Sequence, residues 1–131
     1  AAQTLLEKVG LADMAQHISD TLAYGDIKRL ELAMALVNQP KLLLMDEPTA
    51  GMSPSERHAL MGLVQFLAKE RDVAVIFTEH SMDMVFSFAT RILVMAQGRI
   101  LVEGTPQEVQ NNALAQSVYL GRGKTIEGET V

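Results

Sequence analysis

The sequence predicts an α/β fold built around a parallel β-sheet. Two apolar runs, residues 41–46 and 73–78, have the length and composition of strands buried on both faces. Between them, residues 53–56 (Ser-Pro-Ser-Glu) form a capping box with proline at the first helical position, which predicts a helix over about 54–70. Two buried strands joined by a helix make a right-handed βαβ unit, so the strands should be parallel neighbours.

The segments before this unit have helical patterns. A first helix is predicted over 3–17, although Gly10 interrupts it, and a second over about 26–37. The apolar side chains expected on one face of the first helix are Leu5, Leu6, Val9 and Met14. Those that recur at helical spacing in the second are Ile27, Leu30, Met34 and Val37.

The segments after the βαβ unit predict a short helix, a hairpin and a last helix. The short helix should run through Phe88, and Gln97-Gly98 between residues 92–96 and 99–102 predicts a β-hairpin. Residues 105–108 (Thr-Pro-Gln-Glu) repeat the capping box and should begin a C-terminal helix. Residues 122–131 are polar and rich in glycine, so we expect them to be a flexible tail.

The composition excludes several classes of protein. The 131 residues are 48% hydrophobic and 21% charged, as in one globular domain. The formal net charge of −5 disfavours nucleic acid as a partner. The sequence has no cysteine, which excludes a disulfide framework and a thiolate metal site. No apolar run approaches the length of a membrane span, so any membrane role would come through a partner.

Two adjacent carboxylates, Asp46 and Glu47, end the first predicted strand, and Pro48 follows them. Open α/β sheets bind ligands at the carboxyl ends of their strands, where the loops form a crevice. One such acid can hold Mg²⁺ while the next aligns or deprotonates an attacking water. The same pattern equally fits a strand that ends in a solvated acidic turn.

His80 follows the second predicted strand by two residues. Parallel pairing would place it on the same sheet edge as Asp46 and Glu47. A neutral imidazole there could contact a γ-phosphate oxygen or its water, although a histidine after a strand is more often a surface residue.

The third candidate site is Leu22-Ala23-Tyr24-Gly25-Asp26, just before the second helix. A glycine at a helix start lets backbone N–H groups approach a phosphate, and the helix N-terminus favours the anion. The alternative is that Gly25 and Asp26 only open the helix.

Together these motifs strongly resemble the C-terminal part of an ABC-transporter ATP-binding subunit, over about residues 20–121. Residues 22–26 match the signature loop, 42–47 the Walker B strand, and His80 the switch histidine. The match to the D-loop consists of Ala50, Gly51, Met52 and Ser53. The resemblance implies a partial RecA-like P-loop NTPase fold, with the signature, Walker B and H-loop portion followed by a β-hairpin and helix.

Four short sequence segments narrow the resemblance to one branch of this family. Residues 23–25, 49–52, 103–106 and 119–121 look like the branched-chain amino-acid uptake branch. The implied function is ATP binding and hydrolysis that energises import of branched-chain amino acids or a related small polar solute. Importers of urea and short amides are close relatives and remain an alternative.

The resemblance also implies residue roles. Asp46 would hold Mg²⁺, Glu47 would be the general base or orient the water, and His80 would contact the γ-phosphate of ATP. Residues 22–26 and 50–53 would bind ATP in trans, in a head-to-tail dimer with a second ATP-binding subunit. Further implied partners are membrane permease subunits and, indirectly, a solute-binding protein, with the subunit peripheral at the cytoplasmic face of the inner (plasma) membrane.

Three residues depart from the family pattern. Ala23 replaces a common serine, Asp26 replaces a common glutamine, and Ser53 stands where many relatives have the D-loop aspartate. Because Ala23 lacks the serine hydroxyl, a possible contact to the γ-phosphate is missing. The last change puts any intersubunit salt bridge from that position in doubt.

The phosphate-loop motif G-x-x-x-x-G-K-[ST] does not occur in these residues. Gly123-Lys124-Thr125 resembles only its second half, because Val118 stands where the first glycine is required. The resemblance therefore implies that residues 1–131 are the C-terminal part of an ABC ATPase domain and lack its Walker A half. We expect hydrolysis in a longer parent subunit and an inactive isolated chain. The alternative is a non-catalytic fragment that cannot bind ATP alone.

Overall fold

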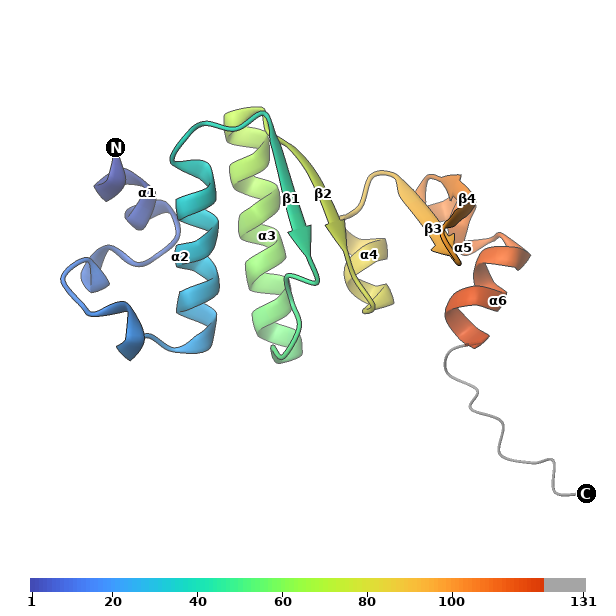
Figure 1. The fold of residues 1–131 in the computed structure, drawn as a ribbon, viewed down its shortest axis with the longest axis horizontal. Coiled ribbons are helices and arrows are strands. Elements are labelled where there is room, and N and C mark those ends of the chain that lie inside the picture. The colour runs from blue at the N-terminus through green and yellow to red at the C-terminus, as the bar shows by residue number, and fades with distance from the viewer. Residues whose placement is uncertain (122–131) are drawn as a thin grey trace, which may run out of the picture. The chain divides into compact units, whose positions relative to one another are not determined.

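The computed structural model describes residues 1–121, which Figure 1 shows as a coloured ribbon. The chain divides into two compact units, Ala1–His80 and a second unit that begins at Ser81, and each is described by itself. The predicted tail at 122–131 and the Gly123-Lys124-Thr125 segment lie outside the described residues.

The first unit contains the predicted βαβ arrangement. Its strands β1 (Leu42–Asp46) and β2 (Ala74–Thr78) pair in parallel, from Leu42 opposite Ala74 to Asp46 opposite Thr78. The connecting helix is α3 (Pro54–Arg71). The elements that precede them are α1 (Ala2–Lys8), η1 (Ala12–Met14), η2 (Ser19–Thr21) and α2 (Tyr24–Leu36). The predicted parallel pairing is confirmed.

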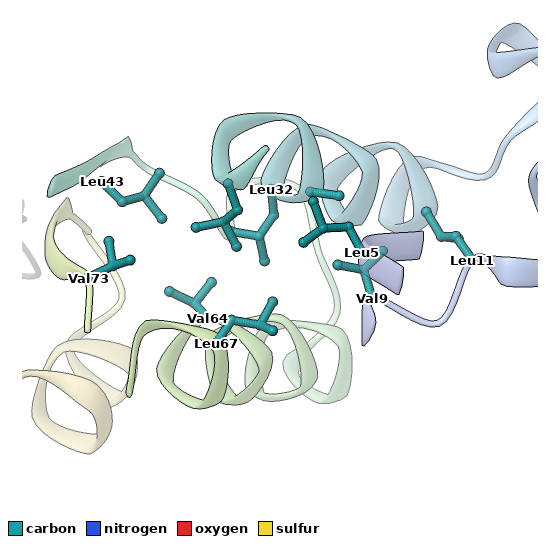
Figure 2. Close-up of a cluster of buried hydrophobic side chains, with 10 residues drawn as sticks. Leu5, Val9, Leu11, Leu32, Leu43, Val64, Leu67 and Val73 are labelled. Atoms are coloured by element: carbon teal, nitrogen blue, oxygen red, sulfur yellow. The ribbon is translucent and has the colours of Figure 1, made fainter. Parts of the chain in front are cut away.

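The core of this unit lies between the helices and one face of the two strands. Figure 2 shows side chains from α1, α2, α3 and β1 pointing toward one another. Its buried members are Leu5, Val9, Leu11, Leu32, Ala33, Leu36, Leu43, Val64, Leu67 and Val73. Burial of such side chains is the main favourable term in folding, so this cluster holds the strands against the helices.

The prediction that both faces of the strands are buried is wrong for the described residues. Leu43 is 8% exposed, whereas Leu44 is 69% and Ile76 60% exposed. Successive side chains of a strand point to opposite faces, and the helical core covers only the face of Leu43.

The predicted helix over 3–17 is too long, since α1 ends at Lys8. Gly10 has a φ of +76°, a left-handed conformation that an α-helix does not contain. The chain turns there and brings Leu11, not Met14, into the core.

The predicted second helix is present as α2, but its buried face differs from the expected one. Leu32, Ala33 and Leu36 are buried, whereas Met34 is 65% and Val37 54% exposed. Apolar residues occur on more than one side of this helix, so spacing alone did not identify the side that packs.

The capping box of α3 is confirmed. The Ser53 hydroxyl accepts the Glu56 N–H at 3.4 Å, and the Glu56 carboxylate accepts the Ser53 N–H at 2.8 Å. The Ser53 side chain, and then its backbone N–H, hold the pKa of the Glu56 carboxyl below its usual range. At the other end, Asp72 adopts the left-handed conformation that terminates helices.

The second unit contains the predicted hairpin. Strands β3 (Ile92–Ala96) and β4 (Arg99–Gly104) pair antiparallel, and β4 extends two residues beyond the predicted end. Gln97 and Gly98 both have positive φ, as a two-residue type I′ turn requires.

Helices complete the second unit. Helix α4 (Met82–Phe88) precedes the hairpin, and α5 (Pro106–Gln110) and α6 (Ala113–Gly121) follow it. The Thr105 capping box is confirmed, but the predicted C-terminal helix is two helices. Asn112 separates them, because its side chain accepts the Ala115 N–H and thereby starts α6. Among the described residues, no helix has both the length and the apolar character needed to cross a membrane.

Truncation of Leu67 should destabilise the protein by about 2–5 kcal/mol, because its removal leaves a cavity in the core. Leu67 is 0% exposed, whereas its neighbour Phe66 on the same helix is 59% exposed. We therefore expect a clearly smaller loss for Phe66→Ala than for Leu67→Ala, measured as the free energy of unfolding in urea. Equal losses would contradict this core assignment.

Candidate functional site

The carboxyl ends of β1 and β2 bring three of the predicted site residues together. The register places Asp46 opposite Thr78, and His80 follows two residues later. The His80 Nε2 atom lies 2.6 Å from Glu47 Oε1, which confirms the predicted proximity. Both side chains face solvent, at 69% exposed for His80 and 45% for Glu47, so this contact contributes little to stability.

Thr78 connects the two carboxylate residues. Its hydroxyl donates to Asp46 Oδ1 at 2.5 Å, and the Glu47 N–H donates to that hydroxyl and to the Thr78 carbonyl, both at 3.1 Å. The sequence reasoning missed Thr78. The signal that identifies it is its place in the register, directly opposite Asp46.

Glu47 has an unusual backbone conformation at the strand tip. Its φ is +45°, in the left-handed region that few residues other than glycine adopt. Bonds from its N–H to Thr78, and from the Ala50 N–H to its carbonyl at 3.1 Å, hold this conformation. The chain therefore turns sharply after Asp46, and the Glu47 carboxylate lies against His80.

Glu79 anchors the loop that follows β1. Its carboxylate accepts the Thr49 N–H at 3.1 Å and the Thr49 hydroxyl at 2.5 Å. Thr49 is only 1% exposed, so both of its polar groups depend on this partner. Sequence reasoning missed both residues, because nothing in the pattern joins positions 30 residues apart in two different loops.

The two loops predicted to bind ATP in trans lie side by side in the first unit. The Tyr24 hydroxyl donates to the Ala50 carbonyl at 3.0 Å, and its ring lies against Gly51, which has a φ of +76°. The Lys28 Nζ lies 5.5 Å from the centre of that ring. A hydrogen bond to Glu31 raises the pKa of Lys28, partly opposed by burial.

The start of α2 differs from its predicted position. The helix begins at Tyr24 with Ala23 as its N-cap, so Gly25 and Asp26 lie within the first turn. Leu22 is extended and precedes the helix. Ala23 provides no side-chain cap, so the first N–H groups of the helix lack that partner.

A shallow pocket lies between the start of α2 and the start of α3. Its lining includes Ala23, Gly25, Asp26, Arg29, Met52 and Glu56. Its volume of about 130 Å³ is below the roughly 300–1,000 Å³ of typical small-molecule sites. These residues can therefore form one wall of a nucleotide site but do not enclose a nucleotide.

The remaining D-loop residues have structural contacts of their own. Ser53 caps α3, and Met52 is 5% exposed with its carbonyl accepting the Arg57 Nε at 3.0 Å. Their side chains are therefore partly committed to the fold of this loop.

The acidic edge fits Mg²⁺ only if other groups supply most of the ligands of the ion. Thr78 engages one oxygen of Asp46, Oδ1, which leaves Oδ2 for an ion or its water. Across residues 1–121, no three His, Cys, Asp or Glu side chains group to hold a metal by themselves. Mg²⁺ commonly takes one or two carboxylates together with phosphate oxygens and waters, which matches this arrangement.

Comparisons with known proteins identify similar sequences and folds. The profile described as ABC transporter matches residues 1–50, and that described as branched-chain amino acid ATP-binding cassette transporter matches 99–125. Over most of its length, the chain is therefore similar to ATP-binding proteins of ABC transporters. The family resemblance of the sequence is thereby confirmed.

Two curated relatives show how much of an ABC subunit the chain represents. It is 41% identical over 120 residues to the high-affinity branched-chain amino acid transport ATP-binding protein LivG of Salmonella typhimurium, covering 92% of the chain and 47% of the relative. It is 40% identical over 116 residues to BraF of Pseudomonas aeruginosa, covering 88% and 46%. The chain spans about half the length of these relatives.

Solved ABC cassettes have the same fold. The ADP conformation of MJ1267, an ATP-binding cassette of an ABC transporter, superposes with a TM-score of 0.83 at 29% identity, over 92% of this chain and 48% of that one. CbiO1 of Clostridium perfringens, part of the ABC transporter complex cbiONQ, gives 0.80 at 30% identity, over 92% and 49%. The predicted partial P-loop NTPase fold is confirmed.

Loss of the Glu79 carboxylate should weaken the loop after β1. Glu79→Ala leaves the buried N–H and hydroxyl of Thr49 without their acceptor, which should cost about 1–3 kcal/mol in the free energy of unfolding. Glu79→Gln keeps an acceptor oxygen and should lose less, as urea denaturation would measure. If both variants match the unaltered protein, Glu79 does not support this loop.

Proposed function

We propose that residues 1–131 are the signature and Walker B portion of a longer ABC subunit that binds and hydrolyses ATP to energise solute import. The observation that carries this proposal is the carboxylate edge. Asp46 and Glu47 end β1, and His80 lies 2.6 Å from Glu47 at the end of the paired strand. No phosphate-loop motif occurs in the sequence, so the proposal assigns hydrolysis to the longer subunit.

The three residues would have distinct roles in hydrolysis. Asp46 would hold Mg²⁺ through Oδ2, and the bound ion would neutralise charge on the phosphates of ATP. Glu47 would orient the attacking water and accept its proton. His80, which is largely exposed beside Glu47, would donate a hydrogen bond to a γ-phosphate oxygen.

The signature loop and the D-loop would serve the nucleotide site of a second ATP-binding subunit. Residues 22–26 would present the first N–H groups of α2 to phosphate. These backbone groups would take over the phosphate contact that a serine hydroxyl makes where this chain has Ala23. Asp26 adds a negative charge at the pocket, which Arg29 also lines. Residues 50–53 would cross the dimer interface while Tyr24 holds them to the signature loop.

Branched-chain amino acids are the solute that the comparisons favour. The relatives named above are branched-chain amino acid transport proteins, and a cassette profile of that branch matches residues 99–125. Membrane permease subunits would be the direct partners, with a solute-binding protein acting through them. The subunit would then be peripheral at the cytoplasmic face of the inner (plasma) membrane. The net charge of −5 remains unfavourable for a nucleic-acid role.

Glu47→Gln in the full-length subunit, assembled with its permease, tests this proposal. Removal of the carboxylate should lower ATP turnover by about 10²–10⁴-fold, the usual contribution of a general base. ATP binding should persist, because the amide keeps the shape of the side chain. Hydrolysis and uptake of labelled leucine into proteoliposomes would be measured on the same preparation.

Glu7→Gln is the matched control, since Glu7 is an exposed glutamate on α1. It should leave turnover and uptake unchanged. Normal hydrolysis by Glu47→Gln would remove Glu47 from this role. Uptake of urea or a short amide in place of leucine would overturn the proposed solute and leave the ATPase assignment standing.

A further inference from the structure

We propose that Thr78 is a positioning residue that sets the orientation of both Asp46 and Glu47. This inference rests on the proposed Mg²⁺ and ATP site at the carboxyl ends of β1 and β2. Thr78 belongs to neither the Walker B strand nor the switch histidine position, yet its hydroxyl contacts both acidic residues.

The direction of the Thr78 hydroxyl follows from its two partners. The Glu47 N–H can only donate, so the hydroxyl oxygen accepts from it at 3.1 Å. A hydroxyl has one proton, and that proton is directed to Asp46 Oδ1 at 2.5 Å.

For Asp46, the bond selects which oxygen faces a ligand. The last torsion of an aspartate side chain is broad and roughly two-fold, so an unrestrained carboxylate rotates readily. With Oδ1 held by Thr78, the rotation is fixed and Oδ2 remains for the ion. Mutation of a group that orients a metal ligand in this way commonly lowers metal affinity by about 10–100-fold.

For Glu47, Thr78 supports the left-handed backbone at the strand tip. Two Thr78 oxygens accept the Glu47 N–H, and the residue keeps a φ of +45°. Loss of the hydroxyl removes one of these acceptors. The turn that carries the Glu47 carboxylate to His80 would then be less restrained.

This role differs from a purely structural one. Thr78 is exposed, so water can replace its bonds and the fold should lose little stability without the hydroxyl. Valine has nearly the same shape and a high strand propensity, so Thr78→Val changes chemistry more than packing. The expected signature is therefore weaker metal binding in a protein of nearly unchanged stability.

The test uses electron paramagnetic resonance to measure Mn²⁺ binding to the full-length subunit in the presence of saturating ADP. Thr78→Val should weaken Mn²⁺ affinity by about 10–100-fold, whereas Thr78→Ser should retain it because serine restores the hydroxyl. Thr4→Val, the same change at an exposed residue of α1, should have no effect. Thr78→Ala is the second hydroxyl-free variant should the valine variant fail to fold.

An Asp46→Asn variant separates this inference from the proposed function. If Asp46→Asn weakens Mn²⁺ binding but a folded Thr78→Val or Thr78→Ala variant does not, the role of Thr78 is overturned and the metal site stands. If Asp46→Asn itself leaves Mn²⁺ affinity unchanged, the proposed metal role of Asp46 fails. A large loss of stability in both hydroxyl-free variants would also overturn the inference, because it would show a structural role.

Discussion

The parallel pairing of β1 with β2 is the constraint on which the candidate site depends. It brings residues more than 30 positions apart to one edge, with Asp46 opposite Thr78. Parallel strands require a crossover, here α3, and the same helix carries much of the core that holds the strands in place. A shift of the register by one residue would move Thr78 from Asp46 and turn the apolar side chains of one strand away from the helices.

Two further contacts tie the loops of the first unit to this edge. Glu79 holds Thr49, which fixes the chain immediately after Glu47, and Tyr24 holds Ala50, which fixes the start of α2 beside the same loop. Movement at the strand tip is thereby linked to the signature loop through one short segment. If the proposed function holds, contacts of this kind would give hydrolysis at the strand tip and contacts to a second subunit a physical route to influence each other.

Local signals in the sequence were sufficient for the starts of α3 and α5, for the hairpin turn and for the βαβ unit, because capping boxes and Gln97-Gly98 act over a few residues. They also placed His80 beside Glu47, since parallel pairing follows from element order. They failed for the buried side of α2 and for the bonds of Thr78. Those depend on which partner surface a helix meets and on exact register, and neither is encoded in a local pattern.

The acidic edge is open to solvent, so the proposed hydrolysis would need further surfaces that exclude water. Glu47 and His80 remain 45% and 69% exposed, and hydrogen bonds to fixed groups act most strongly on reacting charges where water is excluded. The small pocket beside α2 is likewise open and does not enclose a ligand. The acidic edge and this pocket both lie in the first unit and are joined through Ala50. A surface that covered one of them would therefore also restrict the loop that positions the other.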